Sequence, residues 1–316
     1  MAASAMHDLL TDAFLTAFVT GTLLAATPLL LAGLGEQIAE KAGVLNIGLE
    51  GMMLFGAYAG FVAAYDSGSI WLGFAAGGIA GMVPALLMAL FCVRLGMNQI
   101  VIGIALTLGA EGITSLAHHA QFSRTYPRLP QVETLAIPLL DRLPMFGASL
   151  FNSQPLVYVA LALVGFVARL FRSTHVGLNL QAAGDKPTAL DAAGVSVVAT
   201  RSWAELAAGF LAGVGGAYLS TVGAGLFVPF MTNGAGFIAI VLAMLARGRP
   251  VGVLLGALLF SACLSLATAL QVAGFNIPTD VVQMIPFAMV MIVLVLFARR
   301  AHLPAALGLP YQRGAR

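Results

Sequence analysis

The sequence predicts an all-α polytopic membrane protein with about nine transmembrane segments, within a range of about eight to ten. Three observations predict this class. Hydrophobic residues make up 60% of the 316 residues and charged residues only 9%, whereas an average soluble domain carries about 25% charged residues. The apolar residues gather in runs long enough to cross a bilayer, which takes about 20 residues per helix. Glycine is frequent, with 36 residues, as expected where membrane helices pack closely.

The N-terminal half contains four predicted helices, which cover about residues 14–34, 44–65, 70–93 and 98–116. Pro28 is expected to kink the first helix. A short charged turn, Glu36–Lys41, is expected between the first two helices. The first eleven residues contain no Lys or Arg, so the basic region of a secretory signal peptide is missing and the first helix is expected to be retained. A long proline-rich loop, residues 118–154, follows, and we expect it to form a packed extracytoplasmic cap.

The C-terminal half contains predicted helices over about residues 156–171, 202–222, 234–246, 251–272 and 281–298. The helix at 234–246 is too short to span a membrane alone. It follows a glycine-rich break at 223–233. Discontinuous helices of this kind line transport sites in many transporters, so the break is a candidate part of a solute route.

Basic residues near helix ends predict the orientation, because cytoplasmic loops carry an excess of Lys and Arg. Those assigned to the cytoplasmic side are Lys41, Arg94, Arg169, Arg172, Lys186, Arg201, Arg247, Arg249, Arg299 and Arg300. This assignment places the C-terminus in the cytoplasm and the N-terminus outside. The whole chain, residues 1–316, is then one transmembrane domain.

A polar segment, residues 174–195, separates two strongly apolar segments. Pro187 suits the first turn of a short helix, since its missing N–H would have no partner there. Asp185 is expected to cap that turn, and Gly194 is expected to end the helix. A short helix on the cytoplasmic surface offers a docking element for another protein; the alternative is an ordinary surface loop.

The segment Ala183–Val195 resembles the coupling loop of ABC-importer permeases of the branched-chain amino acid, ribose and nucleoside group, whose pattern is close to A-G-x-N-P-x-A-A-x-x-A-G-I. It departs from the pattern at Lys186, where Asn is common, and at Leu190, where Ala is common. Two further segments, Gly43–Ala57 and Gly236–Pro250, are similar to other signatures of the group. The first of these is typical of its nucleoside and simple-sugar branch.

The resemblance implies a permease subunit in the inner membrane that works by alternating access. Its implied partners are a separate ABC ATPase subunit, a second permease subunit (a related chain or a second copy) and an extracytoplasmic solute-binding protein. The ATPase would contact Gly184, Asp185, Lys186, Pro187, Ala189, Leu190, Ala192, Ala193 and Gly194. The implied solute is a nucleoside, with a simple sugar second and a branched-chain amino acid third.

The residues themselves indicate no catalytic or metal site, because no nucleophile–base pair, phosphate-binding loop or metal-ligand spacing is present. We therefore expect no cofactor, and ATP hydrolysis in another subunit. The formal net charge of +2 is too small to indicate nucleic acid as a partner, and the apolar surface is expected to contact lipid.

Polar and aromatic residues inside or beside the apolar segments are the candidates for the solute route, since polar groups are costly in lipid and usually face a cavity or a partner. They are Asn46, Glu50, Asn98, Gln99, Thr107, Glu111, Phe227 and Asn233. Asn46 and Glu50 are four residues apart and are expected to share one face of a helix. The alternatives are that these polar groups tie helices together, or that Asn46 caps its helix. Phe227 has the alternative of being a packing residue. In a rival class, an ion-coupled secondary transporter, Glu50 and Glu111 would be coupling sites.

Overall fold

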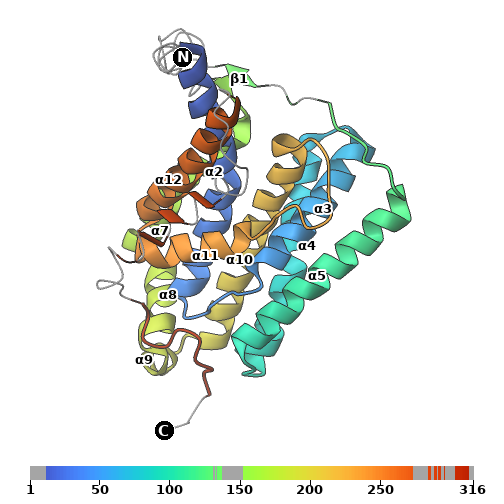
Figure 1. Ribbon diagram of the computed structural model, residues 1–316. Coiled ribbons are helices and arrows are strands. Elements are labelled where there is room, and N and C mark those ends of the chain that lie inside the picture. Colours follow the sequence, from blue (N-terminus) through green and yellow to red (C-terminus); the bar gives the residue numbers. More distant parts are fainter. Residues whose placement is uncertain are drawn as a thin grey trace.

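The computed structural model describes residues 12–130, 132, 134–136, 152–272, 284–285, 288–289, 291–292, 295 and 303–312. Much of the predicted extracytoplasmic loop at 118–154 lies outside the described residues. So does most of the last predicted helix, 281–298. The described residues form a bundle of helices (Figure 1).

The first half of the bundle contains α2 (Asp12–Lys41), α3 (Leu49–Ser67), α4 (Ile70–Met88) and α5 (Gln99–Phe122). A π-helical turn, η1 (Ala89–Arg94), continues α4. Helix α5 runs six residues beyond the predicted end at Leu116, so the loop begins later than expected.

The second half contains α7 (Pro155–Ser173), α8 (His175–Asp185), α9 (Pro187–Ala192), α10 (Val197–Tyr218), the π-helical turn η2 (Leu219–Gly223), α11 (Ala235–Ala246) and α12 (Pro250–Val272). Two short strands, β1 (Leu135–Ala136) and β2 (Asn152–Ser153), pair antiparallel. Five segments of the described chain are long and apolar enough to cross a membrane: Thr16–Lys41, Ile70–Arg94, Gln99–Phe122, Pro155–Ser173 and Val197–Gly223. The all-α polytopic class is thereby confirmed.

The expected charged turn at Glu36–Lys41 is wrong, because α2 continues through it to Lys41. The stretch contains no Pro or Gly to stop the helix. Its polar side chains Glu36, Gln37 and Glu40 are buried, with at most 3% of each exposed. The chain leaves the helix only at Gly43, whose φ of +88° suits glycine.

Helix α10 is the centre of the bundle and packs against α2, α3 and α4. Glycines let the backbones approach one another closely: a Cβ atom on Gly213 would collide with the carbonyl of Gly77, and one on Gly216 with the carbonyl of Met53. Such contacts matter in a membrane, where lipid tails are as apolar as the helices and packing itself drives association.

The two ends of the bundle differ (Figure 1): α2 begins at one end, while α8, α9 and the C-terminal segment lie at the other. At this second end, Lys41, Asp185, Arg247 and Pro304 line a polar pocket of about 200 Å³. Residues predicted to be cytoplasmic from charge alone are thus brought together at the end that carries α8 and α9.

We expect Gly216→Ala to destabilise the protein, because the added methyl group forces α10 away from the backbone of α3. Overpacking of this kind costs about 1–3 kcal/mol. Thermal unfolding of the purified protein measures it. The matched control is Gly112→Ala on α5, where a Cβ atom meets nothing within 4 Å. Equal melting temperatures for the two variants would contradict the packing argument.

Candidate solute route and coupling surface

The chain is interrupted between η2 and α11, as the sequence predicts. Residues 224–234 contain no helix, and Gly225, Phe230, Asn233 and Gly234 have positive φ values of 66°, 64°, 43° and 84°. Helix α11 then begins inside the bundle and is only 12 residues long. Its first N–H groups have no partners within the helix, so another part of the chain must accept their hydrogen bonds.

Glu50 of α3 accepts them. The Gly234 N–H donates to Oε1 at 2.9 Å, and the Gly236 N–H donates to Oε2 at 2.6 Å. A carboxylate at a helix N-terminus also interacts favourably with the helix dipole. Gly236 is required here, because a Cβ atom would lie 2.5 Å from the Cα atom of Glu50. Glu50, whose side chain is only 3% exposed, therefore ties α3 to α11.

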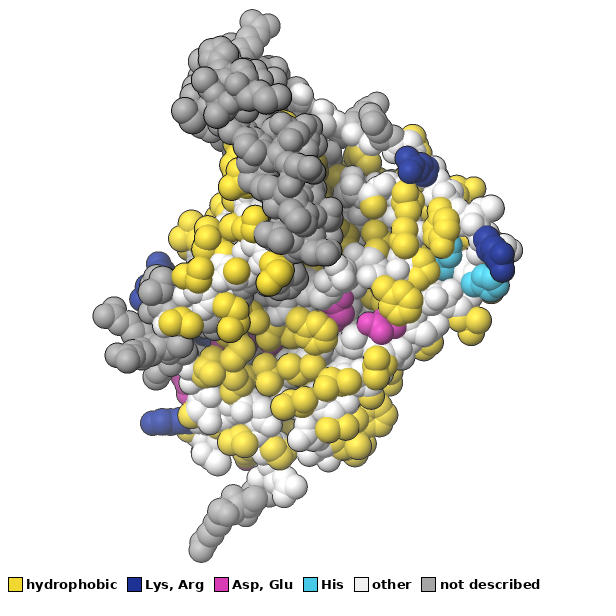
Figure 2. Space-filling model, viewed as in Figure 1, with side chains coloured by type: hydrophobic (Ala, Val, Ile, Leu, Met, Phe, Trp, Pro, Cys, Tyr) yellow, Lys and Arg dark blue, Asp and Glu magenta, His cyan; other side chains and the backbone are white. Residues whose placement is uncertain are grey.

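Two polar residues of α5 lie close to this junction. Helices α3 and α5 touch at Gly51, where an added Cβ atom would be 3.1 Å from the Cα atom of Thr107. The Thr107 hydroxyl is buried and has no hydrogen-bond partner in the described part of the chain. Glu111, one turn further along α5, is half-buried. Figure 2 shows acidic side chains in the middle of an otherwise largely hydrophobic face.

The two candidates at the start of α5 have other partners. The Asn98 side chain caps α5 by accepting hydrogen bonds from the N–H groups of Ile100 and Val101, at 2.9 and 3.2 Å. The Gln99 Oε1 atom accepts from the Leu45 N–H at 2.8 Å. Both residues thus hold the beginning of α5 and its contact with the α2–α3 connection.

Asn46 does not share a helix face with Glu50, because α3 begins only at Leu49. It does not cap α3 either: Gly48 is the N-cap, without a side-chain hydrogen bond. The Asn46 N–H donates to Glu36 Oε1 at 3.3 Å, and its Nδ2 donates to Met52 Sδ at 3.2 Å. The expectation was wrong because contacts with α2 hold this connection in a non-helical path.

Phe227 and Asn233 both lie in the break but in different surroundings. Phe227 is fully buried, with ring centroids 5.2 Å from Tyr58 and 5.5 Å from His118. This geometry is that of a packing residue. Asn233 is exposed, and its positive φ belongs to the turn that leads into α11.

The polar segment at 174–195 forms two helices, α8 and α9. Pro187 occupies the first turn of α9 as predicted, and Gly194 follows its end with φ +83°. The expectation for Asp185 is wrong: it is the last residue of α8, and Lys186 is the N-cap of α9 without a side-chain hydrogen bond. The side chain that caps a helix here is Thr174, whose Oγ1 accepts from the Gly177 N–H at the start of α8.

The predicted ATPase-contacting residues divide into an exposed and a buried group. The exposed ones are Lys186, Ala189, Ala192, Ala193 and Gly194, and Asp185 and Pro187 are half-buried. Leu190 is only 4% exposed and packs with Ala183 and Val197. Gly184 is buried against the carbonyl of Lys41. Helix α9 is therefore anchored on one side by Leu190 and presents small residues on the other.

The sequence did not predict the burial of three ionisable residues near this end of the bundle, Glu36, Arg201 and Glu205, each at most 2% exposed. Arg201 served only as a marker of orientation. A charged residue within the apolar run Val197–Tyr218 was the available signal, because such residues usually face the interior of a membrane bundle.

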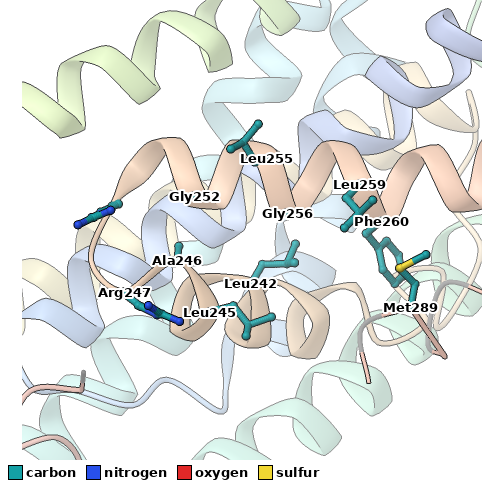
Figure 3. Close-up of a pocket in the computed structure, with 11 residues that line it drawn as sticks. Leu242, Leu245, Ala246, Arg247, Gly252, Leu255, Gly256, Leu259, Phe260 and Met289 are labelled. Atoms are coloured by element: carbon teal, nitrogen blue, oxygen red, sulfur yellow. The ribbon is translucent and has the colours of Figure 1, made fainter. Parts of the chain in front are cut away.

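A separate apolar pocket of about 360 Å³ lies between α11 and α12 (Figure 3). Phe260 and Met289 lie side by side at one end of it, and Arg247 lies at the other. Eleven residues line it, and Arg247 and Arg249 are the two among them with polar side chains. Because an arginine side chain donates hydrogen bonds but accepts none, the described lining offers a polar solute no side-chain oxygen acceptor, unlike Thr107 and Glu111.

Residues 18–294 match the family described as "Branched-chain amino acid transport system / permease component". The chain belongs to this family. It is similar to a putative glucose ABC transporter permease protein of Haloferax volcanii, with 40% identity over 78% of this chain and 75% of that protein. A nucleoside ABC transporter permease protein of Lactococcus lactis is 31% identical, over 93% of this chain and 96% of that protein. A guanosine ABC transporter permease protein of Bacillus subtilis is 30% identical, over 96% and 98%.

We expect Glu50→Gln to lower the stability of the permease, whereas the same change at Glu111 leaves it nearly unaltered. Glutamine keeps the shape of Glu50 but presents an NH₂ group to one of the two N–H donors of α11. Losing a hydrogen bond to a charged group costs about 1.5–3 kcal/mol. Thermal unfolding of both variants measures the difference, and equal unfolding temperatures would show that Glu50 does not hold α11.

Proposed function

We propose that this chain is the permease subunit of an ATP-driven ABC importer that moves a nucleoside across the plasma membrane by alternating access. Family membership supports a permease component, and favours ATP-driven transport over ion-coupled secondary transport. Two relatives that cover more than 90% of the chain are named as nucleoside or guanosine permeases. Lactococcus lactis has a further nucleoside ABC transporter permease protein, 27% identical to this chain. This pair supports a related chain as the second permease subunit.

The observation that carries the proposal is the interrupted helix α11 held by Glu50 beside the polar face of α5. The N–H groups of Gly234 and Gly236 already occupy both Glu50 oxygens. Glu111, which is half-buried, is left as the group that can receive a solute, and the buried, unpartnered Thr107 hydroxyl joins it when α3 and α5 move apart. A carboxylate and a hydroxyl accept hydrogen bonds from ribose hydroxyls, and a threonine hydroxyl also donates one. Because α11 meets α3 through two hydrogen bonds, a small movement there opens or closes the route.

A simple sugar is the second candidate, favoured by the glucose permease relative at 40% identity. The two solutes differ in the base, which is a flat ring. Phe237, on the first turn of α11, is 42% exposed and is the aromatic residue we assign to stack on that ring. A sugar needs no such partner for binding through its hydroxyls.

We place α8, α9 and the C-terminal segment in the cytoplasm, where an ATPase subunit contacts the small exposed residues of α9. An extracytoplasmic solute-binding protein then delivers the solute to the opposite end. The charge distribution supports this side, because Lys41, Arg201, Arg247 and Arg249 all lie near the end that carries α8 and α9.

We expect the ATPase subunit to co-purify with this chain, and to be lost when Ala189 and Ala193 are both replaced by Arg. Both positions are exposed, so two long charged side chains block docking while leaving the fold intact. The matched control is Ala120→Arg, an exposed position in the last turn of α5, a helix whose first turn lies by the α2–α3 connection. Recovery of equal amounts of ATPase with the double variant would overturn the assignment of α9.

We expect Glu111→Gln to lower nucleoside uptake roughly tenfold or more at full expression, as fits the loss of a charged hydrogen-bond acceptor. Uptake of labelled guanosine and labelled glucose by cells that make the whole transporter measures it. Phe237→Ala distinguishes the two solutes: it lowers uptake of guanosine if the ring stacks on a base. Unchanged uptake with Glu111→Gln would reduce Glu111 to a packing role.

A further inference from the structure

Arg201 is the most deeply buried Lys or Arg residue that the structure describes, with 2% of its surface exposed. Its Nε donates to the Ala42 carbonyl at 3.1 Å, and its Nη1 to the Leu309 carbonyl at 2.7 Å. Its Nη2 donates to the carbonyls of Ala183 at 3.0 Å and Ala306 at 3.4 Å. One guanidinium thus contacts the end of α2, the end of α8 and the C-terminal segment.

These carbonyls explain how a buried arginine is stabilised. The last carbonyls of a helix have no partner within the helix, and the C-terminus of a helix attracts a cation. Ala42 follows the last residue of α2, and Ala183 lies in the last turn of α8. The residue that would normally donate to the Ala183 carbonyl is Pro187, which has no N–H. Arg201 supplies the missing donor.

The C-terminal segment, residues 303–312, is held by the same region through its own backbone. The Ala306 N–H donates to the Gly184 carbonyl at 2.8 Å, and the Gly308 N–H donates to the Gly43 carbonyl at 3.1 Å. Gly43 and Gly184 are also in contact with each other, since a Cβ atom on Gly184 would be 3.1 Å from the Gly43 N atom. The segment therefore joins the α2–α3 connection to the end of α8.

Tyr311 extends this contact to α9. It packs against the cluster of Ala183, Leu190 and Val197. Leu190 is the residue that anchors α9, so the C-terminal segment touches the inner side of the helix whose outer side is exposed. Val197 of this cluster is the first residue of α10, and Arg201 lies one turn further along the same helix.

We infer that Arg201 and residues 303–312 join α8 and α9 to α2 and α10 as one rigid coupling unit, which passes the movement of the ATPase to the solute route. This inference rests on the proposed function. The connection held by the unit leads directly to α3: Gly43 accepts from the C-terminal segment, Asn46 donates to Glu36 of α2, and Glu50 holds α11. Arg201 is thus a positioning residue for transport, far from the solute.

The test uses the whole transporter in proteoliposomes, with ATP hydrolysis and solute uptake measured on the same sample. The variants are Arg201→Lys, Tyr311→Ala and deletion of residues 303–316. Lysine keeps the charge but has a single, compact donor group that does not span four carbonyls. The control is Gln312→Ala, an exposed position at the end of the segment.

We expect all three variants to co-purify with the ATPase and to hydrolyse ATP, while the amount of solute moved per ATP falls by at least about fivefold, the low end of coupling between distant sites. A merely structural role would lower both activities together and leave their ratio unchanged. An unchanged ratio in Tyr311→Ala and in the deletion variant would overturn the inference. So would loss of ATPase binding in these variants, because the segment would then be a docking surface. Failure of the unaltered chain to bind an ATPase would instead overturn the proposed function.

Discussion

Helices that end inside this protein must have their free backbone groups satisfied, because the surroundings offer little water to do so. Glu50 does this for the N-terminus of α11, and Arg201 does it for the C-termini of α2 and α8. Each of these charged residues is buried, and each has backbone groups from distant segments as partners. These two side chains stabilise the interruption of the bundle at α11 and the closure of its end at α8.

Close backbone packing supports both arrangements. Helix α10 contacts α2, α3 and α4 through glycines with no room for a side chain. The column formed in this way carries Arg201 at one end and leads into the break before α11 at the other. A displacement at the end of α8 therefore has a tightly packed path along α10 to the break before α11.

Polar residues in the apolar segments have three uses in this structure. Asn98 and Gln99 hold the start of α5, and Asn46 holds the connection between α2 and α3. Glu50 holds α11. Thr107 and Glu111 have no such task in the described part of the chain, which is why the proposed route runs beside α5.

The sequence alone determined the membrane class, the positions of most helices, the break before α11, and the roles of Pro187 and Gly194 in α9. These follow from local signals: runs of apolar residues, missing N–H groups and glycine at positive φ. Only the tertiary structure decided that α2 continues to Lys41, that Asn46 lies outside α3, that Glu50 caps α11 and that Arg201 is buried. These depend on contacts between residues far apart in the chain, 184 positions for Glu50 and Gly234 and 159 for Arg201 and Ala42, and no local pattern records which distant backbone group a charged side chain will meet.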